Sequence, residues 1–291
     1  MARFSALDPR LDPYGEADNR ERVRRLTVAR RRPARSTSSP GLSIIVLNKD
    51  RPDLLGALWQ SFSEVRRIGT DRCVDVELLV GDTGSTDPAA VALLDAPPDG
   101  TRVVRGLTYQ FSRNNNDLFQ SSRGSVALFM NNDVLVDRNP AALIDAYERL
   151  VADPGLGAIG AVMYFADGTI QHAGIDFLRD PAVYGLPFHP GARSTREFPD
   201  GLFLPVPAVT GAFLMMPADL FDAVGGFDEG YAKECQDVDL CLKAAWLGKR
   251  VEVASLGHLV HLENATRITG EEDWPDRALF LRRWGSFVET M

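Results

Sequence analysis

Cysteine is scarce in this sequence, which contains three cysteines, Cys73, Cys235 and Cys241, in 291 residues. Their number is odd and no pair has the Cys-x-x-Cys spacing, so they support no disulfide framework. We therefore expect a reducing compartment, the cytoplasm. Cys241 lies in a helical pattern and is most simply interpreted as a small buried apolar residue.

Long apolar runs are also missing. The first residues contain no apolar segment of the kind found in secretory signals, so we expect no such signal. One uncharged stretch, 201–218, is long enough to be considered as a membrane span. Pro205, Pro207 and Pro217 divide it into short extended pieces, and we predict core strand and loop there.

Positive charge is in deficit over the whole chain but concentrated in one segment. A net charge of -8 and a pI near 5.1 argue against a nucleic-acid partner. Residues 1–35 nevertheless carry ten arginines against five acids, a net charge of +5, which leaves -13 for the rest. We predict that residues 1–40 form a solvated basic tail. The alternative is contact with anionic lipid at the inner face of a membrane or with an acidic partner.

The remaining sequence has the pattern of an α/β domain. The whole chain, with 45% hydrophobic and 25% charged residues, has the composition of an ordinary soluble protein. Apolar runs of strand length, each followed by a polar turn and a helical pattern, occur at 42–47, 76–80, 103–104 and 126–130. These repeats predict a mainly parallel, doubly wound sheet with helices on both faces. The turns should gather at one edge, so we expect Asp50, Asp82 and Asp133 to line one crevice.

The fourth apolar run ends abruptly in three side chains that offer oxygen atoms, Asn131, Asn132 and Asp133. Carboxylate and carboxamide oxygens suit a hard divalent cation that also holds phosphates. Asparagine and aspartate are ordinary turn formers as well. These residues alone therefore leave both a metal-diphosphate site and a plain turn open.

Several segments, in this order and spacing, resemble the family 2 glycosyltransferases. They are 43–50 (SIIVLNKD), 84–87 (GSTD), 111–115 (FSRNN) and 131–133 (NND). A fifth, 167–174 (DGTIQHAG), is similar to a segment typical of the branch that builds bacterial O-antigens, rhamnans and related cell-surface polysaccharides. The resemblance covers about residues 42–267, and no G-x-G-x-x-G or Walker sequence competes with it.

The resemblance implies a GT-A fold that binds a nucleotide-diphospho-sugar donor together with Mg²⁺ or Mn²⁺. It places Asp133 at the last position of the family's metal-binding Asp-x-Asp signature and Asn131 at the first, and it adds His261 as a metal ligand. A carboxamide at position 131 removes one negative charge, so metal affinity should depend more on the donor's own phosphates. The donor-binding residues that it implies are Asn48, Asp50, Asp82 at the nucleoside, Asn114, Asn115, Asn132 and Arg267.

The second half resembles the acceptor side of the same family. Its segment 236–240 (QDVDL) matches the family's Glu-Asp-x-Asp-Leu pattern, which implies that Asp237 is the catalytic base of an inverting transfer. From the residues alone, acids at the start of a helix could simply cap it. Because Gln236 is neutral, we expect Asp237 to be ionised near pH 7. The residues predicted on the acceptor side are His172, Gly211 and Asp239, the last also as a brace for its helix.

The predicted organisation is a tail (1–40), a glycosyltransferase domain (41–270) and a closing helix (271–291). Within the domain, residues 41–137 would form the nucleotide-sugar half and 138–270 the acceptor half. The predicted function is metal-dependent transfer of a hexosyl or deoxyhexosyl group from a UDP-, dTDP- or GDP-linked donor. The acceptor would be a saccharide or lipid-linked saccharide in cell-surface polysaccharide synthesis.

Two other functions remain open from the sequence. Asn131 and Gln236 depart from the family pattern and motivate a nucleotide-sugar or carbohydrate binding protein with decayed catalysis. A sugar nucleotidyltransferase would also use a doubly wound sheet and metal-bound carboxylates. The absence of a glycine-rich phosphate loop with lysine near the first strand disfavours it.

Overall fold

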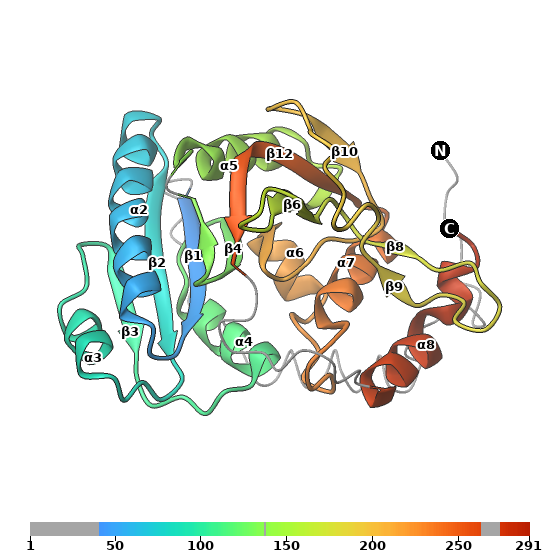
Figure 1. Ribbon diagram of the computed structural model, residues 1–291, viewed down its shortest axis with the longest axis horizontal. Coiled ribbons are helices and arrows are strands. Elements are labelled where there is room, and N and C mark those ends of the chain that lie inside the picture. Colours follow the sequence, from blue (N-terminus) through green and yellow to red (C-terminus); the bar gives the residue numbers. More distant parts are fainter. Residues whose placement is uncertain (1–40, 137, 263–273) are drawn as a thin grey trace.

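The computed structural model describes residues 41–136, 138–262 and 274–291 (Figure 1). The predicted tail at 1–40 and the predicted phosphate ligand Arg267 lie outside these residues. Within the described ranges, none of the helices combines the length and apolarity needed to cross a membrane.

A ten-stranded sheet forms the centre of the molecule, in the order β10-β12-β6-β11-β4-β1-β2-β3, with β5 paired to β12 and β7 paired to β6. The strands are β1 (Gly41–Asn48), β2 (Asp75–Asp82), β3 (Thr101–Val104), β4 (Val126–Asn131), β5 (Val134–Leu135), β6 (Leu156–Tyr164), β7 (Ile170–His172), β10 (Phe203–Pro205), β11 (Phe213–Pro217) and β12 (Arg250–His261). A separate two-stranded sheet pairs β8 (Asp176–Phe177) with β9 (Pro187–Phe188).

Strands β4, β1, β2 and β3 are parallel neighbours, as the β-then-α repeats predict. In the register of these strands, Asn48 lies beside Asp82, and Leu47 lies beside Asn131. The carboxyl ends of β1, β2 and β4 therefore reach the same level at one edge of the sheet. This is where ligands collect in open α/β sheets.

The sheet becomes mixed at β11, which runs antiparallel to both of its neighbours, β4 and β6. The sequence pattern predicts a strand over 209–216 with Gly211 in its middle, and this is wrong in its first residues. The strand begins at Phe213, after a turn in which Phe213 N donates to Thr210 O at 3.2 Å. Gly211 thus lies in a turn at the edge of the sheet. The proline-rich stretch 201–218 contains β10 and β11, in agreement with the prediction of strand and loop.

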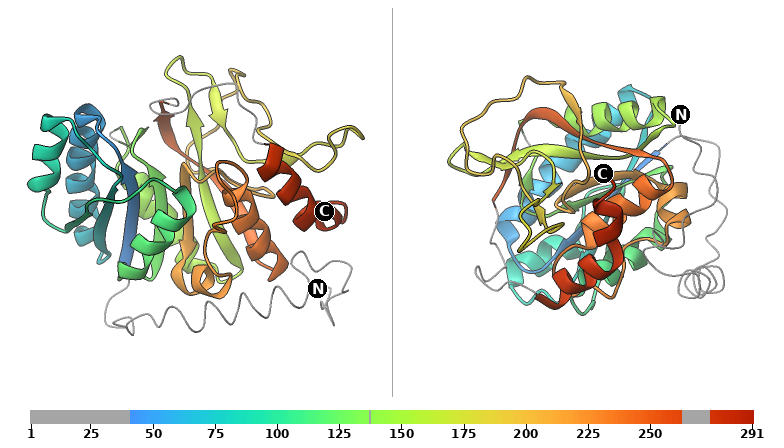
Figure 2. Two further views of the ribbon diagram at one scale, coloured as in Figure 1. Left: turned by 90° about the horizontal axis from the view of Figure 1, so that it is seen from below. Right: turned by 90° about the vertical axis from the view of Figure 1, so that its right-hand side faces the viewer.

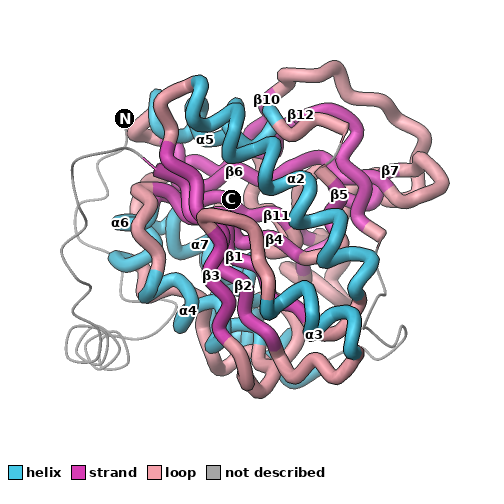
Figure 3. The backbone as a smooth tube through the Cα atoms, turned by 90° about the vertical axis from the view of Figure 1, so that its left-hand side faces the viewer, coloured by secondary structure: helices cyan, strands magenta, loops and turns pink. Residues whose placement is uncertain are grey.

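Helices cover both faces of the sheet, which confirms the doubly wound arrangement (Figures 2 and 3). They are α2 (Pro52–Asp71), α3 (Pro88–Asp95), α4 (Phe111–Ser121), α5 (Ala141–Ala152), α6 (Ala218–Ala223), α7 (Gln236–Trp246) and α8 (Trp274–Val288). Residues of α2 and α5 build one hydrophobic core, and residues of α4, α6, α7 and α8 build the other. Successive side chains of β1 alternate between them, since Ile44 and Val46 join the first core and Ile45 the second. Apolar residues on both faces of this strand account for its unbroken hydrophobic run.

Gly160 offers a test of the packing between the sheet and the loop before β11. It lies in the buried strand β6, and a Cβ added there would stand 2.5 Å from Cβ of Val209. We expect Gly160→Ala to lower the free energy of unfolding by about 1–3 kcal/mol, because a close-packed core must shift to admit the methyl group. Urea denaturation measures the change.

Gly56 provides the matched control. It lies within α2 with no neighbouring atom within 4 Å of an added Cβ. The same substitution there should raise the free energy of unfolding by about 0.5–1 kcal/mol, because alanine favours the helix. A Gly160→Ala variant as stable as the parent would contradict the packing seen here.

Candidate active site

Two distant segments meet just beyond the end of β4. Asp133 follows this strand, and β12 ends at His261, which is paired in register with Val134. His261 Nε2 lies 3.2 Å from Asp133 Oδ1 and 3.4 Å from Asn131 Nδ2. Asp133 and His261 are each 6% exposed. The fold therefore brings together the three residues predicted to hold a metal.

This donor set fits a divalent cation that is shared with a ligand. It offers a carboxylate, an imidazole nitrogen (Nε2) and a carboxamide oxygen. Within those residues no three His, Cys, Asp or Glu side chains converge closely enough to hold a metal ion. Magnesium-type sites commonly use one or two carboxylates and complete the shell with substrate phosphates and water. A cation bound jointly with a diphosphate matches that pattern.

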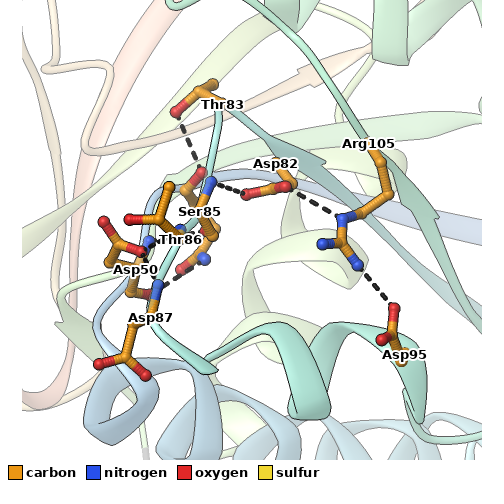
Figure 4. A network of polar contacts seen from close by, with 9 residues as sticks. Asp50, Asp82, Thr83, Ser85, Thr86, Asp87, Asp95 and Arg105 are labelled. Atoms are coloured by element: carbon orange, nitrogen blue, oxygen red, sulfur yellow. Dashed lines mark hydrogen bonds and ion pairs between the residues drawn. The ribbon is translucent and has the colours of Figure 1, made fainter. Parts of the chain in front are cut away.

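Asp50 joins two loops at the same edge. Its Oδ1 accepts from the amides of Thr86 at 2.6 Å and Asp87 at 2.8 Å, and its own amide donates to Ser85 Oγ at 2.7 Å (Figure 4). The Asp87 and Thr86 amides hold the pKa of Asp50 below its ordinary value. Asp50 thus fixes the loop after β1 to the loop after β2, a role that the donor-binding prediction did not include.

Asp82 ends β2 and is 2% exposed. Its Oδ1 accepts from the amide of Ser85 at 3.0 Å, and its Oδ2 accepts from Arg105 Nε at 3.0 Å (Figure 4). Arg105 also pairs with Asp95 at 2.7 Å. A carboxylate held in this way can still accept a hydrogen bond from a base or ribose. Sequence reasoning missed Arg105, since it belongs to no motif and reaches Asp82 only because β3 pairs with β2.

The carboxamides of Asn48 and Asn132 connect the ends of β1 and β4. Asn132 Nδ2 donates to Asn48 Oδ1 at 2.9 Å, and Asn48 Nδ2 donates to Asp50 O at 3.2 Å. These two predicted donor-binding residues therefore fix the end of β1 to the turn after β4.

The sequence predicts the asparagine run 114–116 at or near the cap of a helix, and the run lies near the N-terminal end of α4. The N-cap itself is Gln110. Asn114 Oδ1 accepts from Gln110 N at 2.8 Å, and Asn115 Nδ2 donates to Phe111 O at 2.9 Å. Both side chains are buried and stabilise the first turn of α4.

Asn116, the next residue of the run, had no predicted role. Its Nδ2 donates to Phe227 O at 2.9 Å, and its Oδ1 accepts from Phe227 N at 3.0 Å. This pair of hydrogen bonds ties α4 to the chain that leads into α7. The only signal in the sequence was its place in the asparagine run.

Asp237 lies in the first turn of α7 and is partly exposed. Its Oδ2 accepts from the amide of Gly211 at 2.8 Å, and its Oδ1 accepts from the amide of Val238 at 2.9 Å. A Cβ on Gly211 would stand 3.0 Å from Cζ of Phe111. Glycine therefore allows the chain to approach both the aromatic ring and the carboxylate.

Asp239 has its contacts inside the protein, which corrects its assignment to the acceptor. Its side chain is fully buried, accepts from Trp284 Nε1 at 2.9 Å and pairs with Lys243 Nζ at 2.6 Å. It braces α7 against α8, in agreement with the second role predicted for it.

His172 is fully buried as well, so it cannot contact an acceptor directly. Its Nε2 accepts from the amide of Gly174 at 3.3 Å, which leaves the proton on Nδ1, 2.9 Å from His189 Nδ1. Burial lowers the pKa of His172 well below its ordinary value, and the nearby His189 and His261 act in the same direction. Burial thus corrects the prediction of direct acceptor binding, while an indirect role of His172 in shaping the acceptor side stays a prediction.

The sequence is similar to that of known proteins of polysaccharide synthesis. No family model matches the chain. It is 32% identical over 281 residues to the O-antigen biosynthesis protein RfbC of Myxococcus xanthus, a match that covers 91% of this chain and 20% of RfbC. The chain thus spans about a fifth of that relative's length. An N-acetylglucosaminyl-diphospho-decaprenol L-rhamnosyltransferase of Mycobacterium tuberculosis is 28% identical over 66% of this chain and 68% of its own length.

The fold resembles that of solved glycosyltransferases. The mannosyltransferase PcManGT from Pyrobaculum calidifontis, solved in complex with GDP-Man and Mn²⁺, superposes with a TM-score of 0.53 at 17% identity. The match covers 92% of this chain and 70% of that one. At this level of identity the likeness establishes the GT-A fold.

The buried His172 predicts a pH dependence of stability. Its folded-state pKa lies well below the value of about 6.5 expected in the unfolded chain. As the pH falls below about 6.5, the unfolded chain therefore binds a proton that the folded chain does not, and stability decreases by up to about 1.4 kcal/mol per pH unit. We expect His172→Gln to remove this component, as measured by urea denaturation between pH 7.5 and 5.

The exposed His258, stacked on Tyr164, serves as the control. His258→Gln should keep the parental pH dependence. Identical slopes for the parent and His172→Gln would show that His172 titrates normally in the folded protein.

Proposed function

We propose that this chain transfers a sugar from a nucleotide-diphosphate donor to a saccharide acceptor, since its fold is that of the GT-A glycosyltransferases and its sequence is similar to an O-antigen biosynthesis protein and a rhamnosyltransferase. One feature supports this above all. Asn131 N donates to Ala212 O at 3.0 Å, while Gly211 N donates to the carboxylate of Asp237 at 2.8 Å. The adjacent residues Gly211 and Ala212 therefore link the proposed base, Asp237, to Asn131 of the proposed metal site.

On the donor side, Asp133 and His261 would hold Mg²⁺ or Mn²⁺, and Asn131 would add a neutral oxygen. A bound cation would stabilise the negative charge that develops on the leaving diphosphate. Because these three ligands carry only one negative charge between them, we propose that the cation binds together with the donor's phosphates. Asp82 would accept a hydrogen bond from the nucleoside.

On the acceptor side, Asp237 would accept the proton of the attacking hydroxyl group. Two amides orient its carboxylate at the start of α7. A base held on the face opposite the leaving group leads to inversion at the sugar carbon. We therefore propose an inverting transfer.

The names of the relatives suggest the substrate class. One is named for O-antigen biosynthesis and another for L-rhamnosyl transfer to a diphospho-decaprenol-linked sugar. We propose a deoxyhexosyl donor, with nucleotide-linked L-rhamnose the first to test, and a lipid-linked saccharide acceptor. We place the reaction in the cytoplasm, where free thiols such as those of the three cysteines persist.

Replacement of the proposed base is the direct test. Asp237→Asn keeps the shape of the side chain but cannot take up the proton, so we expect kcat to fall by about 10²–10⁴-fold.

A screen of UDP-, dTDP- and GDP-sugars by thermal shift with Mn²⁺ identifies the donor, since a ligand of the folded state raises Tm. Radiolabelled transfer is then measured. Donor binding without metal-dependent transfer by the parent would instead support a decayed binding protein, and pyrophosphate release from a nucleoside triphosphate would support a nucleotidyltransferase.

The metal assignment makes a separate prediction. Asp133→Ala should abolish Mn²⁺-dependent donor binding while the circular dichroism spectrum stays parental, because it removes the one carboxylate in the cluster. Asn131→Ala should weaken binding less, because a neutral oxygen contributes less to a divalent cation. Calorimetric titration of the identified donor with and without Mn²⁺ compares the two. Parental transfer by Asp133→Ala would refute the assignment.

A further inference from the structure

The chain that leads into the proposed base has little regular structure of its own. We call residues 227–235 the base loop, because this segment, between α6 and α7, ends at the residue before α7 and so leads to the proposed base. It ends at Cys235, which has a left-handed backbone with φ of 67° and makes no side-chain cap for α7. The position of Asp237 therefore depends on what holds this loop.

Helix α8 holds the loop through one buried carboxylate. Asp276, in the first turn of α8, is 3% exposed. Its Oδ2 accepts from the amides of Ala232 at 3.0 Å, Lys233 at 2.7 Å and Glu234 at 2.9 Å, and its Oδ1 accepts from Ala232 at 3.0 Å. Three successive amides around one carboxylate form an anion-binding nest. The nest ends three residues before Asp237.

Further pairs join α8 to both sides of the base. Arg277 pairs with Glu234 at 2.9 Å, and Arg283 pairs with Asp228 at 3.0 Å. Beyond the base, Trp284 donates to Asp239. Helix α8 thus holds the base loop and the first turn of α7, on either side of Asp237.

We propose that Asp276 is a positioning residue for sugar transfer: its carboxylate gathers the amides of the base loop and thereby aims Asp237 at the acceptor hydroxyl. The inference rests on the proposed function of Asp237. Asp276 acts away from the donor residues at the ends of β1, β2 and β4, so its loss should affect catalysis and leave donor binding intact. A displacement of about 1 Å at a reacting group can cost about 100-fold in rate.

Amide hydrogen exchange tests the loop independently of any activity. In Asp276→Ala, the amides of Ala232, Lys233 and Glu234 should exchange at least about tenfold faster, since each loses its acceptor. Peptides from β1 and β2 should keep parental rates. Glu289→Ala is the matched control, because it removes an exposed acid just after the same helix. Unchanged exchange at 232–234 in Asp276→Ala would overturn the inference.

Kinetics then separates positioning from general destabilisation. With the donor identified by the screen, Asp276→Ala should lower kcat by about 10–100-fold while the donor Kd with Mn²⁺ stays within about twofold of the parent. Asp276→Asn, which keeps the shape but puts an NH₂ group among the amides, provides a second variant if alanine prevents folding. Parallel loss of donor binding and kcat, or a parental kcat, would overturn the proposal.

Added formate gives a positive test. The truncated side chain of Asp276→Ala leaves the nest without its carboxylate, and formate can supply one. We expect millimolar formate to slow the exchange of amides 232–234 and to restore part of kcat, with no effect on the parent. Failure of formate to change either quantity would count against the nest. If the parent transfers no sugar from any donor, the proposed function fails, whereas the exchange result still decides whether Asp276 holds the loop.

Discussion

The direction of one strand determines where the two halves of the site meet. Strand β11 lies between β4 and β6 and runs antiparallel to both. Its amino end therefore stands at the edge where β4 ends, and the turn before it lies beside Asn131. A parallel strand in this place would put its carboxyl end there instead. Because β11 is reversed, Gly211 can donate to Asp237 while the next residue, Ala212, accepts from Asn131 of the proposed metal site.

Three of the acids at this edge share a second constraint, since backbone amides orient each of them. Asp50 accepts from the loop after β2, Asp82 accepts from Ser85, and Asp237 accepts from Gly211. Such hydrogen bonds fix the direction of a carboxylate before a ligand arrives, and this lowers the cost of ordering the site on binding. As a consequence, one oxygen of Asp50 and both oxygens of Asp82 and Asp237 already accept a hydrogen bond, so a ligand must approach the remaining lone pairs.

The cluster of Asp133, His261 and Asn131 carries little negative charge for a site that would hold a divalent cation. One carboxylate, one imidazole and one carboxamide supply less negative charge than a pair of aspartates would. A divalent cation bound by such a set gains a large part of its neutralisation from the diphosphate of its partner ligand. The proposed order, in which cation and donor bind together, follows from this balance.

Much of the fold and part of the site were accessible from the sequence. Apolar runs of strand length ending in polar turns identified β1, β2 and β4, and the acids after them were expected at one edge. These features depend on side-chain alternation and turn chemistry within a few residues, which the sequence displays directly.

The pairing of distant residues was decided by the tertiary structure. His261 reaches Asp133 because β12 pairs with β5, and Arg105 reaches Asp82 because β3 pairs with β2. Burial likewise removed His172 and Asp239 from direct contact with a substrate. By itself, the sequence determined which segments carry the chemistry. Strand order and packing determined which side chains meet at the site, because both depend on contacts between residues that are far apart in the sequence and that no local pattern relates.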